Sequence, residues 1–297
     1  MQSISEEELF QKKYDRQMRI KGWDQKKVSS QICLLLGIGG LGSTVAIGLA
    51  RLGVKKLIMI DYDKVEYSNL NRQVLFKLED VGSSKVEAAA KNLKALHDFS
   101  NSEIYNLDVI KNWGKVVNLA KESTVIFNMI DYGDYCDAAI QSLAINLGIP
   151  LIMGGTFCQV MTVDFFYPQW FGGCYICSSD LKKEKLDHLS PSKISDYQDL
   201  SFLPKNNNPI GQSNYYLASL CANAMISRFS SYLMKDKVKG MNRLIFSSNE
   251  MDSDKFDVLR EKDCPLCSNV KQEIFQLEVL RPFRQVDALM NLYSFVE

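Results

Sequence analysis

The chain is organised as short apolar runs that alternate with stretches of helical periodicity. Residues 32–36 form a continuous apolar run typical of a buried strand, and residues 41–52 place apolar side chains at helical spacing before Gly53. The same patterns predict strands at 32–37, 56–61, 103–107, 124–129 and 150–154, and helices at 41–52, 83–96, 111–120 and 135–148. Such alternation with short links predicts an α/β fold, a Rossmann-like doubly wound, mainly parallel sheet. Two additional C-terminal strands are predicted at 243–247 and 255–260.

A glycine-rich turn, residues 37–42, joins the first predicted strand to the first predicted helix. Gly39, Gly40 and Gly42 leave the backbone N–H groups open to a phosphate at the helix N-terminus, where the helix dipole also favours an anion. Asp61 ends the second predicted strand, at the place where a ribose-binding carboxylate is expected about twenty residues after the glycines. On its own, this arrangement predicts a nucleotide site and favours a dinucleotide enzyme.

Cationic and amide side chains follow Asp61 and change that expectation. Asn69, Arg72 and Gln73 lie in one short run, and Lys85 comes shortly afterwards. A dehydrogenase has no need of two cations beside its nucleotide. A triphosphate cleaved between its α and β groups does need them, because its charge must be neutralised and its leaving group stabilised.

Taken together, these residues resemble the adenylation domain shared by ubiquitin-activating enzymes and the bacterial ThiF and MoeB proteins. The resemblance covers residues 14–267 and leaves an N-terminal arm, 1–13, and a C-terminal extension, 268–297. It implies that the chain binds ATP and Mg²⁺, with the phosphates against the glycine turn and the ribose at Asp61. It implies that three residues contact the triphosphate: Asn69, Arg72 and Lys85. Gln73 would orient one of them.

Two further positions match the family pattern. Residues 14–19 resemble its entry motif, which leads into a helix and carries an arginine that reaches the triphosphate of the other subunit. The resemblance therefore implies that Arg16 acts in trans within a homodimer or heterodimer; a solvated helix charge is the alternative. Asp131 matches the magnesium-binding second aspartate of the family's Asp-x-x-Asp-Asn, although Asn128 and Tyr132 replace two of its neighbours. The alternative role for Asp131 is a helix N-cap.

Two C-x-x-C pairs predict a structural zinc site. Cys174 and Cys177 form one pair, and Cys264 and Cys267 form the other. Four thiolates suit a closed tetrahedral zinc ion, which has no open position for catalysis. Such binding supplies on the order of 10 kcal/mol of folding free energy and would pin the C-terminal segment to the middle of the chain. Redox-active pairs are the alternative.

The polar stretch 178–213 is interpreted as a long, mobile crossover loop, and long loops tend to be functional. In ubiquitin-activating relatives this loop carries or precedes the cysteine that takes the activated carboxylate, but here no cysteine lies between Ser178 and Leu220. Cys158 follows a predicted strand and could face the site. Three other thiols are interpreted as buried core residues: Cys33, Cys136 and Cys221.

The overall composition narrows the class of protein. Lysine plus arginine number 35 and equal aspartate plus glutamate, which argues against nucleic acid or anionic membranes as partners. No apolar run has the length of a membrane span, so a cytoplasmic or nuclear protein is expected. Eight cysteines then favour thiols and metal over disulfides, and two histidines make a Ser–His or Cys–His mechanism improbable.

The resemblance implies attack by a carboxylate on the α-phosphate of ATP. A C-terminal carboxylate has a pKa of about 3.5 and needs no general base, which fits the scarcity of histidine. The first hypothesis is adenylation of the C-terminus of a ubiquitin-like or sulfur-carrier protein. The second is a microcin-type peptide-adenylating enzyme without a thioester step, and the third is a non-thioester-forming subunit of a heterodimeric activating enzyme. A nicotinamide enzyme is a distant fourth.

Overall fold

The computed structural model describes residues 5–99, 101–167, 172–179, 181, 186–204, 212–234 and 242–270. The strands of these residues are β1 (Ile32–Leu36), β2 (Lys56–Ile60), β3 (Ser102–Tyr105), β4 (Val125–Asn128), β5 (Leu151–Phe157), β6 (Val160–Phe166), β7 (Arg243–Ser247) and β8 (Asp252–Phe256). Their α-helices are α1 (Glu6–Met18), α2 (Gln25–Ser29), α3 (Gly40–Leu52), α4 (Lys85–His97), α5 (Trp113–Lys121), α6 (Asp134–Leu147) and α7 (Tyr215–Leu233). Short 3₁₀ turns are η1 (Tyr67–Asn69), η2 (Leu78–Asp80), η3 (Tyr175–Ser178), η5 (Asp187–Leu189) and η6 (Ile194–Asp196).

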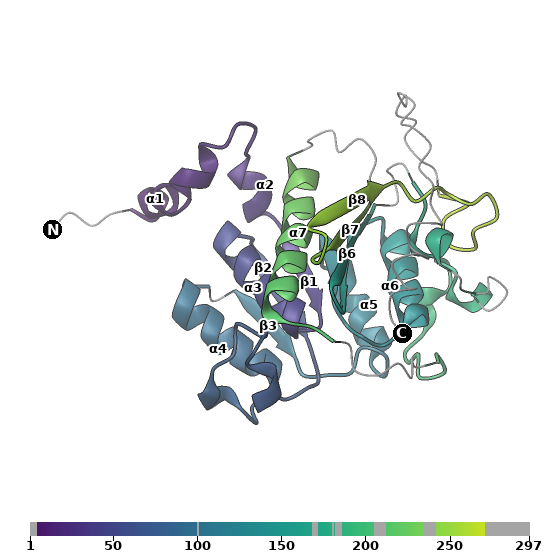
Figure 1. Cartoon of the computed structure of the whole chain (residues 1–297), viewed down its shortest axis with the longest axis horizontal. Coiled ribbons are helices and arrows are strands. Elements are labelled where there is room, and N and C mark those ends of the chain that lie inside the picture. The colour runs from purple at the N-terminus through teal and green to yellow at the C-terminus, as the bar shows by residue number, and fades with distance from the viewer. Residues whose placement is uncertain are drawn as a thin grey trace.

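All eight strands form one sheet, in the order β3-β2-β1-β4-β5-β6-β7-β8. The pairs from β3 to β5 are parallel, and β6, β7 and β8 extend the sheet in antiparallel fashion. Helices α3, α4 and α7 lie on one side of the sheet and α5 and α6 on the other (Figure 1). The predicted doubly wound α/β fold with additional C-terminal strands is therefore confirmed.

Alternation along β1 divides its side chains between two cores. Leu35 packs in the cluster that contains Phe229 of α7, whereas Leu34 packs in the cluster that contains Trp113 of α5. Because successive strand residues point to opposite faces, a strand buried on both sides must be apolar throughout. This is why β1 is a continuous apolar run, and it places the first glycine turn at the carboxyl edge of a rigid central strand.

Strands β6 and β8 differ from the sequence-based expectation. The expected strand at 150–154 is longer and turns directly into β6, which the prediction lacked. The turn contains no glycine; instead Cys158 adopts a positive φ of 51°, so the usual hairpin signal is missing. The strand expected at 255–260 lies earlier, at 252–256, because the preceding turn at Met251, with φ 53°, sets its pairing with β7.

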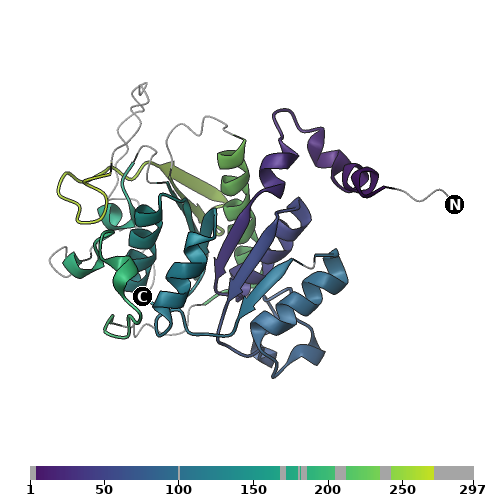
Figure 2. The ribbon, with the colours of Figure 1, turned by 180° about the vertical axis from the view of Figure 1, so that it is seen from behind.

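The N-terminal helix projects from the body of the molecule in both views (Figures 1 and 2). Ser5 caps it, and α1 includes residues 6–13, which had been expected to form a partly ordered arm. Tyr14 is buried where it packs on Gly53, at the end of α3. The motif at 14–19 therefore lies at the end of α1, and α2 (Gln25–Ser29) follows it ahead of β1. None of the helices in the described residues is both long and apolar enough to cross a membrane.

The described part of the crossover, residues 186–204, packs against the body of the protein. Leu186, Leu189, Ile194, Leu200 and Leu203 are buried in the same core as Trp113. Trp113 Nε1 donates a hydrogen bond of 2.8 Å to Ile194 O, and Leu200 N donates one of 2.9 Å to Ile110 O. The prediction of a long mobile loop is wrong for these residues, because leucines spaced through a polar segment anchor it to α5 and α6.

Candidate nucleotide site

The glycine turn at the end of β1 depends on close backbone approach. Gly37 has φ 89°, and a methyl group placed on it would lie 2.9 Å from Met129 O. A methyl group on Gly42 would lie 2.1 Å from Gly37 O, so the first turn of α3 packs on the turn that precedes it. At Gly40 a methyl group would meet only ordinary contacts, the nearest being Ala218 Cβ at 3.6 Å. Glycine is therefore needed for the fold at positions 37 and 42.

Asp61, directly after β2, is tied to the glycine turn. Its Oδ2 accepts a hydrogen bond from Ile38 N at 2.7 Å, and its Oδ1 accepts one from Asp63 N at 2.8 Å. Burial raises the pKa of Asp61, while Lys85 and the two backbone N–H groups act in the opposite direction. The structure thus brings the predicted ribose carboxylate to the edge of the predicted phosphate cradle.

Arg72 and Gln73 lie against the same turn. A methyl group on Gly40 would be 3.7 Å from Arg72 Cγ, and one on Gly39 would be 3.9 Å from Gln73 Nε2. The guanidinium of Arg72 donates to Ser68 O at 3.1 Å. Gln73 is only 4% exposed, and its Oε1 is buried without a hydrogen-bond partner among the described residues. A buried unsatisfied oxygen is costly, so this atom marks a place where a ligand donor would be favourable.

Lys85, at the start of α4, points back to the segment that follows Asp61. Its Nζ lies 2.7 Å from Asp63 Oδ2, and its side chain is 8% exposed. Asn69 is buried, but its Oδ1 accepts a hydrogen bond from Glu66 N at 3.0 Å. The carbonyl end of Asn69 therefore shapes the η1 turn. Its Nδ2 donates a long hydrogen bond of 3.5 Å to Ser68 Oγ, which leaves one amide N–H for a ligand.

A buried polar pair supports the segment that carries these residues. Asn92 of α4 donates hydrogen bonds to Leu75 O at 2.9 Å and to Asp80 Oδ2 at 2.7 Å. Hydrogen bonds to Asp80 from Asn92 and from the backbone of Lys77 outweigh its desolvation and lower its pKa. The irregular stretch between η1 and α4 is therefore held to the rigid helix, which keeps Arg72 beside the glycine turn.

Asp131 follows β4, the parallel neighbour of β1, and is exposed. The residue preceding α6 is Gly133, with φ 123°, so the N-cap alternative for Asp131 is wrong. Two residues before Asp131, Met129 N donates to Leu36 O at 2.9 Å. Asp131 therefore follows directly on a segment that is bonded to the end of β1, next to the glycine turn.

Arg16 is not brought to this site within the same chain. Gln17 Nε2 donates to Leu52 O at 3.0 Å, which fixes the end of α1 at the C-terminal end of α3. The glycine turn lies at the opposite end of this 13-residue helix, roughly 18 Å away at 1.5 Å per residue. Arg16 is exposed.

The four cysteines of the two C-x-x-C pairs come together. The sulfur pairs Cys174–Cys177, Cys174–Cys264 and Cys177–Cys267 are 4.0, 3.6 and 3.5 Å apart. Thiolates around a tetrahedral zinc ion lie about 3.8 Å apart, given a Zn–S bond of about 2.3 Å. Hydrogen bonds with Cys174 and Cys267 lower the pKa of Cys177 to about 7, whereas the pKa of Cys174 and that of Cys267 are raised. These residues fit zinc, and they join two segments distant in sequence.

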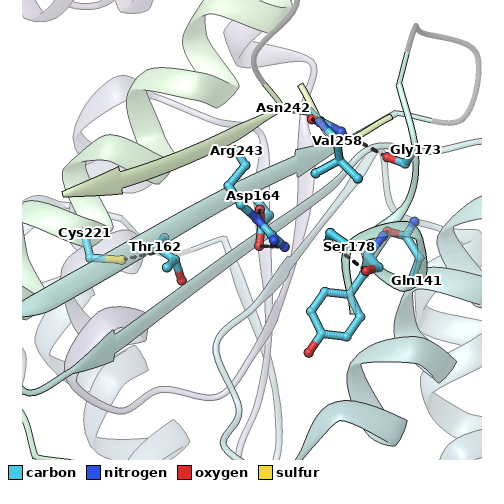
Figure 3. A network of polar contacts seen from close by, with 10 residues as sticks. Gln141, Thr162, Asp164, Gly173, Ser178, Cys221, Asn242, Arg243 and Val258 are labelled. Atoms are coloured by element: carbon cyan, nitrogen blue, oxygen red, sulfur yellow. Dashed lines mark hydrogen bonds and ion pairs between the residues drawn. The ribbon is translucent and has the colours of Figure 1, made fainter. Parts of the chain in front are cut away.

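The backbone around the cluster explains this close approach. Asn242 Nδ2 donates to Gly173 O at 3.0 Å, and its Oδ1 accepts from Val258 N at 2.7 Å (Figure 3). A methyl group on Gly173 would lie 2.6 Å from Leu259 O. One buried asparagine therefore bridges the two zinc-binding segments before any metal is considered.

The remaining thiols follow the prediction. Cys33, Cys136 and Cys221 are buried, and burial raises the pKa of Cys221 to about 12, so this thiol is inert at neutral pH. Cys158 lies in the β5–β6 turn, where its Sγ donates to Gln212 Oε1 at 3.4 Å. Its polar contact is thus with the end of the crossover segment.

Two carboxylates at the site were not selected from the sequence. Asp63 pairs with Lys85, and Asp137 accepts a hydrogen bond from Asn128 Nδ2 at 2.7 Å. Asp63 lies two residues after Asp61, and this closeness in sequence was the feature that could have indicated it. No feature of the sequence indicated Asp137, because its contact with Asn128 depends on where α6 begins.

Comparison with known proteins assigns the class. The model of the ThiF family matches residues 14–267, so the chain belongs to the ThiF family. Among curated relatives, ubiquitin-like modifier-activating enzyme 5 of Drosophila virilis is 38% identical over 102 residues, which cover 34% of this chain and 25% of that protein. The enzyme of the same name from Mus musculus is 36% identical over 113 residues, covering 37% and 28%. The matched region thus spans about a quarter of these relatives.

Solved structures show the same fold. E. coli MccB in a complex described as MccB + MccA-N7isoASN has a TM-score of 0.71 at 20% identity, covering 87% of this chain and 75% of that one. PaaA has a TM-score of 0.66 at 20% identity, covering 88% and 76%. The fold prediction and the family resemblance are therefore confirmed.

Proposed function

We propose that this chain binds Mg-ATP and adenylates the C-terminal carboxylate of a ubiquitin-like or sulfur-carrier protein, releasing pyrophosphate. The observation that carries the proposal is the placement of Arg72 and Gln73 against Gly40 and Gly39. The unpartnered Oε1 of Gln73 would accept a hydrogen bond from a hydroxyl or amino group of the nucleotide, and the N-terminus of α3, which has no side-chain cap, suits its phosphates. The curated relatives, named as modifier-activating enzymes, support the same reaction class.

Each residue of the site would have a role in the reaction that follows from its chemistry. ATP would supply the electrophilic α-phosphate and the leaving group. Asp61 would accept a ribose hydroxyl, while Arg72 and Lys85 would neutralise phosphate charge. Asp131 would contribute one carboxylate ligand to magnesium, which commonly keeps several waters. Because the attacking carboxylate is already ionised at neutral pH, positioning is the main task of the protein.

A peptide is the second candidate acceptor. The structural neighbours include MccB solved with MccA, and residues 178–220 of this chain contain no cysteine. Without a cysteine in this segment, a thioester step there has no nucleophile. A peptide-adenylating enzyme would need none.

ATP–pyrophosphate exchange with candidate carrier proteins and peptides tests the proposal. Exchange is expected with one class of acceptor, and a DTT-sensitive adduct would indicate a later thioester. Arg72→Ala should abolish exchange without loss of folding, because Arg72 is on the surface of the site. If exchange persists in Arg72→Ala, the assignment of the site is wrong.

A further inference from the structure

At the end of β4, the side chain of Asn128 makes two polar contacts. Its Nδ2 donates to Asp137 Oδ1 at 2.7 Å, and its Oδ1 accepts a longer hydrogen bond of 3.4 Å from Ile130 N. Asn128 is 3% exposed, so water does not compete freely for these groups. Because Asp137 Oδ1 is the acceptor of this hydrogen bond, it takes the NH₂ end of the amide. The carbonyl end is then directed to Ile130.

This amide lies at the base of the segment that ends in Asp131. Met129 N is bonded to Leu36 O, and methyl groups on Gly37 would touch both Met129 O at 2.9 Å and Ile130 Cγ2 at 3.0 Å. The backbone between Asn128 and Asp131 is therefore packed on the glycine turn. The contact from Asp137 fixes its near end.

Two of the carboxylates around Asp137 have partners of their own. Asp134 Oδ1 accepts from Tyr175 OH at 2.9 Å. Asp164 of β6 is paired with Arg243 of β7, at 2.5 and 3.1 Å, and Figure 3 shows the two side chains meeting. Asp137 instead accepts its hydrogen bond from a neutral amide.

This arrangement has an electrostatic cost. Burial and the nearby charges of Asp134, Asp164 and Asp131 together raise the pKa of Asp137 to about 7, against the Asn128 hydrogen bond, which lowers it. An alanine or leucine at this place would avoid the cost. Asp137 is half-buried by its solvent exposure, and a carboxyl group with a raised pKa beside a candidate ligand site points to a functional role.

We propose that Asp137 is a positioning residue for the magnesium ion of bound ATP: through Asn128 it holds the end of β4 so that Asp131 is presented to the metal. The inference rests on the proposed function. It also accounts for asparagine at position 128, where the family pattern has aspartate. Asn128 and Asp137 together provide one amide and one carboxylate, and the carboxylate comes from α6.

The test measures ATP binding by calorimetry, once with Mg²⁺ and once with EDTA. In Asp137→Ala the gain in ATP affinity from Mg²⁺ should fall about tenfold, the size typical of residues that orient metal ligands. Affinity in EDTA should stay as in the unaltered protein. A merely structural role would weaken binding under both conditions or abolish folding, and either result overturns the inference.

Two further variants make the test specific. Asp134→Asn removes a carboxylate from the same helical turn and should leave the Mg²⁺ effect unchanged; an equal loss there would show general electrostatics instead of positioning. The double variant Asn128→Asp/Asp137→Asn exchanges the partners and should restore the Mg²⁺ effect. If the unaltered protein binds no ATP in either buffer, the proposed function itself fails and this inference falls with it. Normal ATP binding with an unchanged Mg²⁺ effect in Asp137→Ala overturns this inference alone.

Discussion

Lys85 Nζ and Asp63 Oδ2 form an ion pair of 2.7 Å at the edge of the candidate nucleotide site. The lysine side chain is 8% exposed and the aspartate side chain 49% exposed. The buried ammonium of Lys85 is therefore paired with a carboxylate that is accessible to water. A phosphate group is a stronger anion and can take over that partnership.

Replacing Asp63 tests this exchange. Asp63→Asn should lower the free energy of unfolding by about 1 kcal/mol or less in the absence of nucleotide, because half-exposed ion pairs contribute little. Added Mg-ATP should then raise the melting temperature of the variant more than that of the unaltered protein. Differential scanning fluorimetry with and without Mg-ATP measures both effects. An equal shift in the two proteins would contradict a role for Lys85 in phosphate binding.

The two glycines of the turn should respond differently to alanine. Gly42→Ala places a methyl group 2.1 Å from Gly37 O and should lower the melting temperature sharply or prevent folding. Gly40→Ala meets its nearest neighbour at 3.6 Å and should fold normally. Thermal unfolding of the purified variants separates the two cases. Similar stability of both would show that the turn is not held as described.

Loss of one thiol from the metal cluster should remove the zinc. Cys264→Ser is expected to lose bound zinc and several kcal/mol of folding free energy. Cys221→Ser is the matched control, because this thiol is buried away from the cluster and should leave the metal content unchanged. Elemental analysis gives the zinc stoichiometry, and chelator should lower the melting temperature of the unaltered protein. Full zinc content in Cys264→Ser would argue against the site.

Asp137 makes stability depend on pH. Its folded pKa, about 7, is above that of an unfolded aspartate, so its favourable contribution is complete at low pH and is lost as pH rises through about 7. Asp137→Asn should therefore stabilise the protein more at pH 8 than at pH 5. Urea unfolding of both proteins across this range measures the difference. A constant difference would mean that Asp137 is not the titrating group.

The trans role proposed for Arg16 predicts that each active site contains residues from both subunits of a dimer. If it acts in trans, Arg16→Ala and Arg72→Ala should each be inactive in pyrophosphate exchange, and mixing them should restore part of the activity. A mixed dimer would contain one site with both arginines intact. Sedimentation analysis checks that the variants still associate. Mixtures that stay inactive although they form dimers would exclude an arginine supplied in trans.

The sequence was most informative where chemistry and backbone geometry act over short distances. Gly42 and Asp61 could be placed because a tight turn between a strand and a helix needs glycine at fixed spacing. In the structure Gly42 packs on Gly37, and Asp61 accepts a hydrogen bond from Ile38 N of the same turn. The two C-x-x-C pairs were informative for the same reason, since each pair presents its sulfurs locally.

Contacts set by tertiary structure could not be predicted. The pairing of Asn128 with Asp137 requires α6 to start one residue after Gly133, whose φ of 123° breaks the register expected from periodicity. Strand β6 was missed because Cys158 takes a positive φ that the sequence does not signal. Residues 186–204 were predicted to be mobile because the segment is mostly polar, although its spaced leucines pack into the core.

The cysteine cluster has a consequence for biogenesis. Its ligands come from two places in the chain, so the metal centre cannot close until Cys267 has been synthesised, whereas β1, α3 and β2 are complete long before. Zinc capture is then a late event in maturation, and cells short of zinc would accumulate chains with a formed glycine turn and an unanchored C-terminal segment.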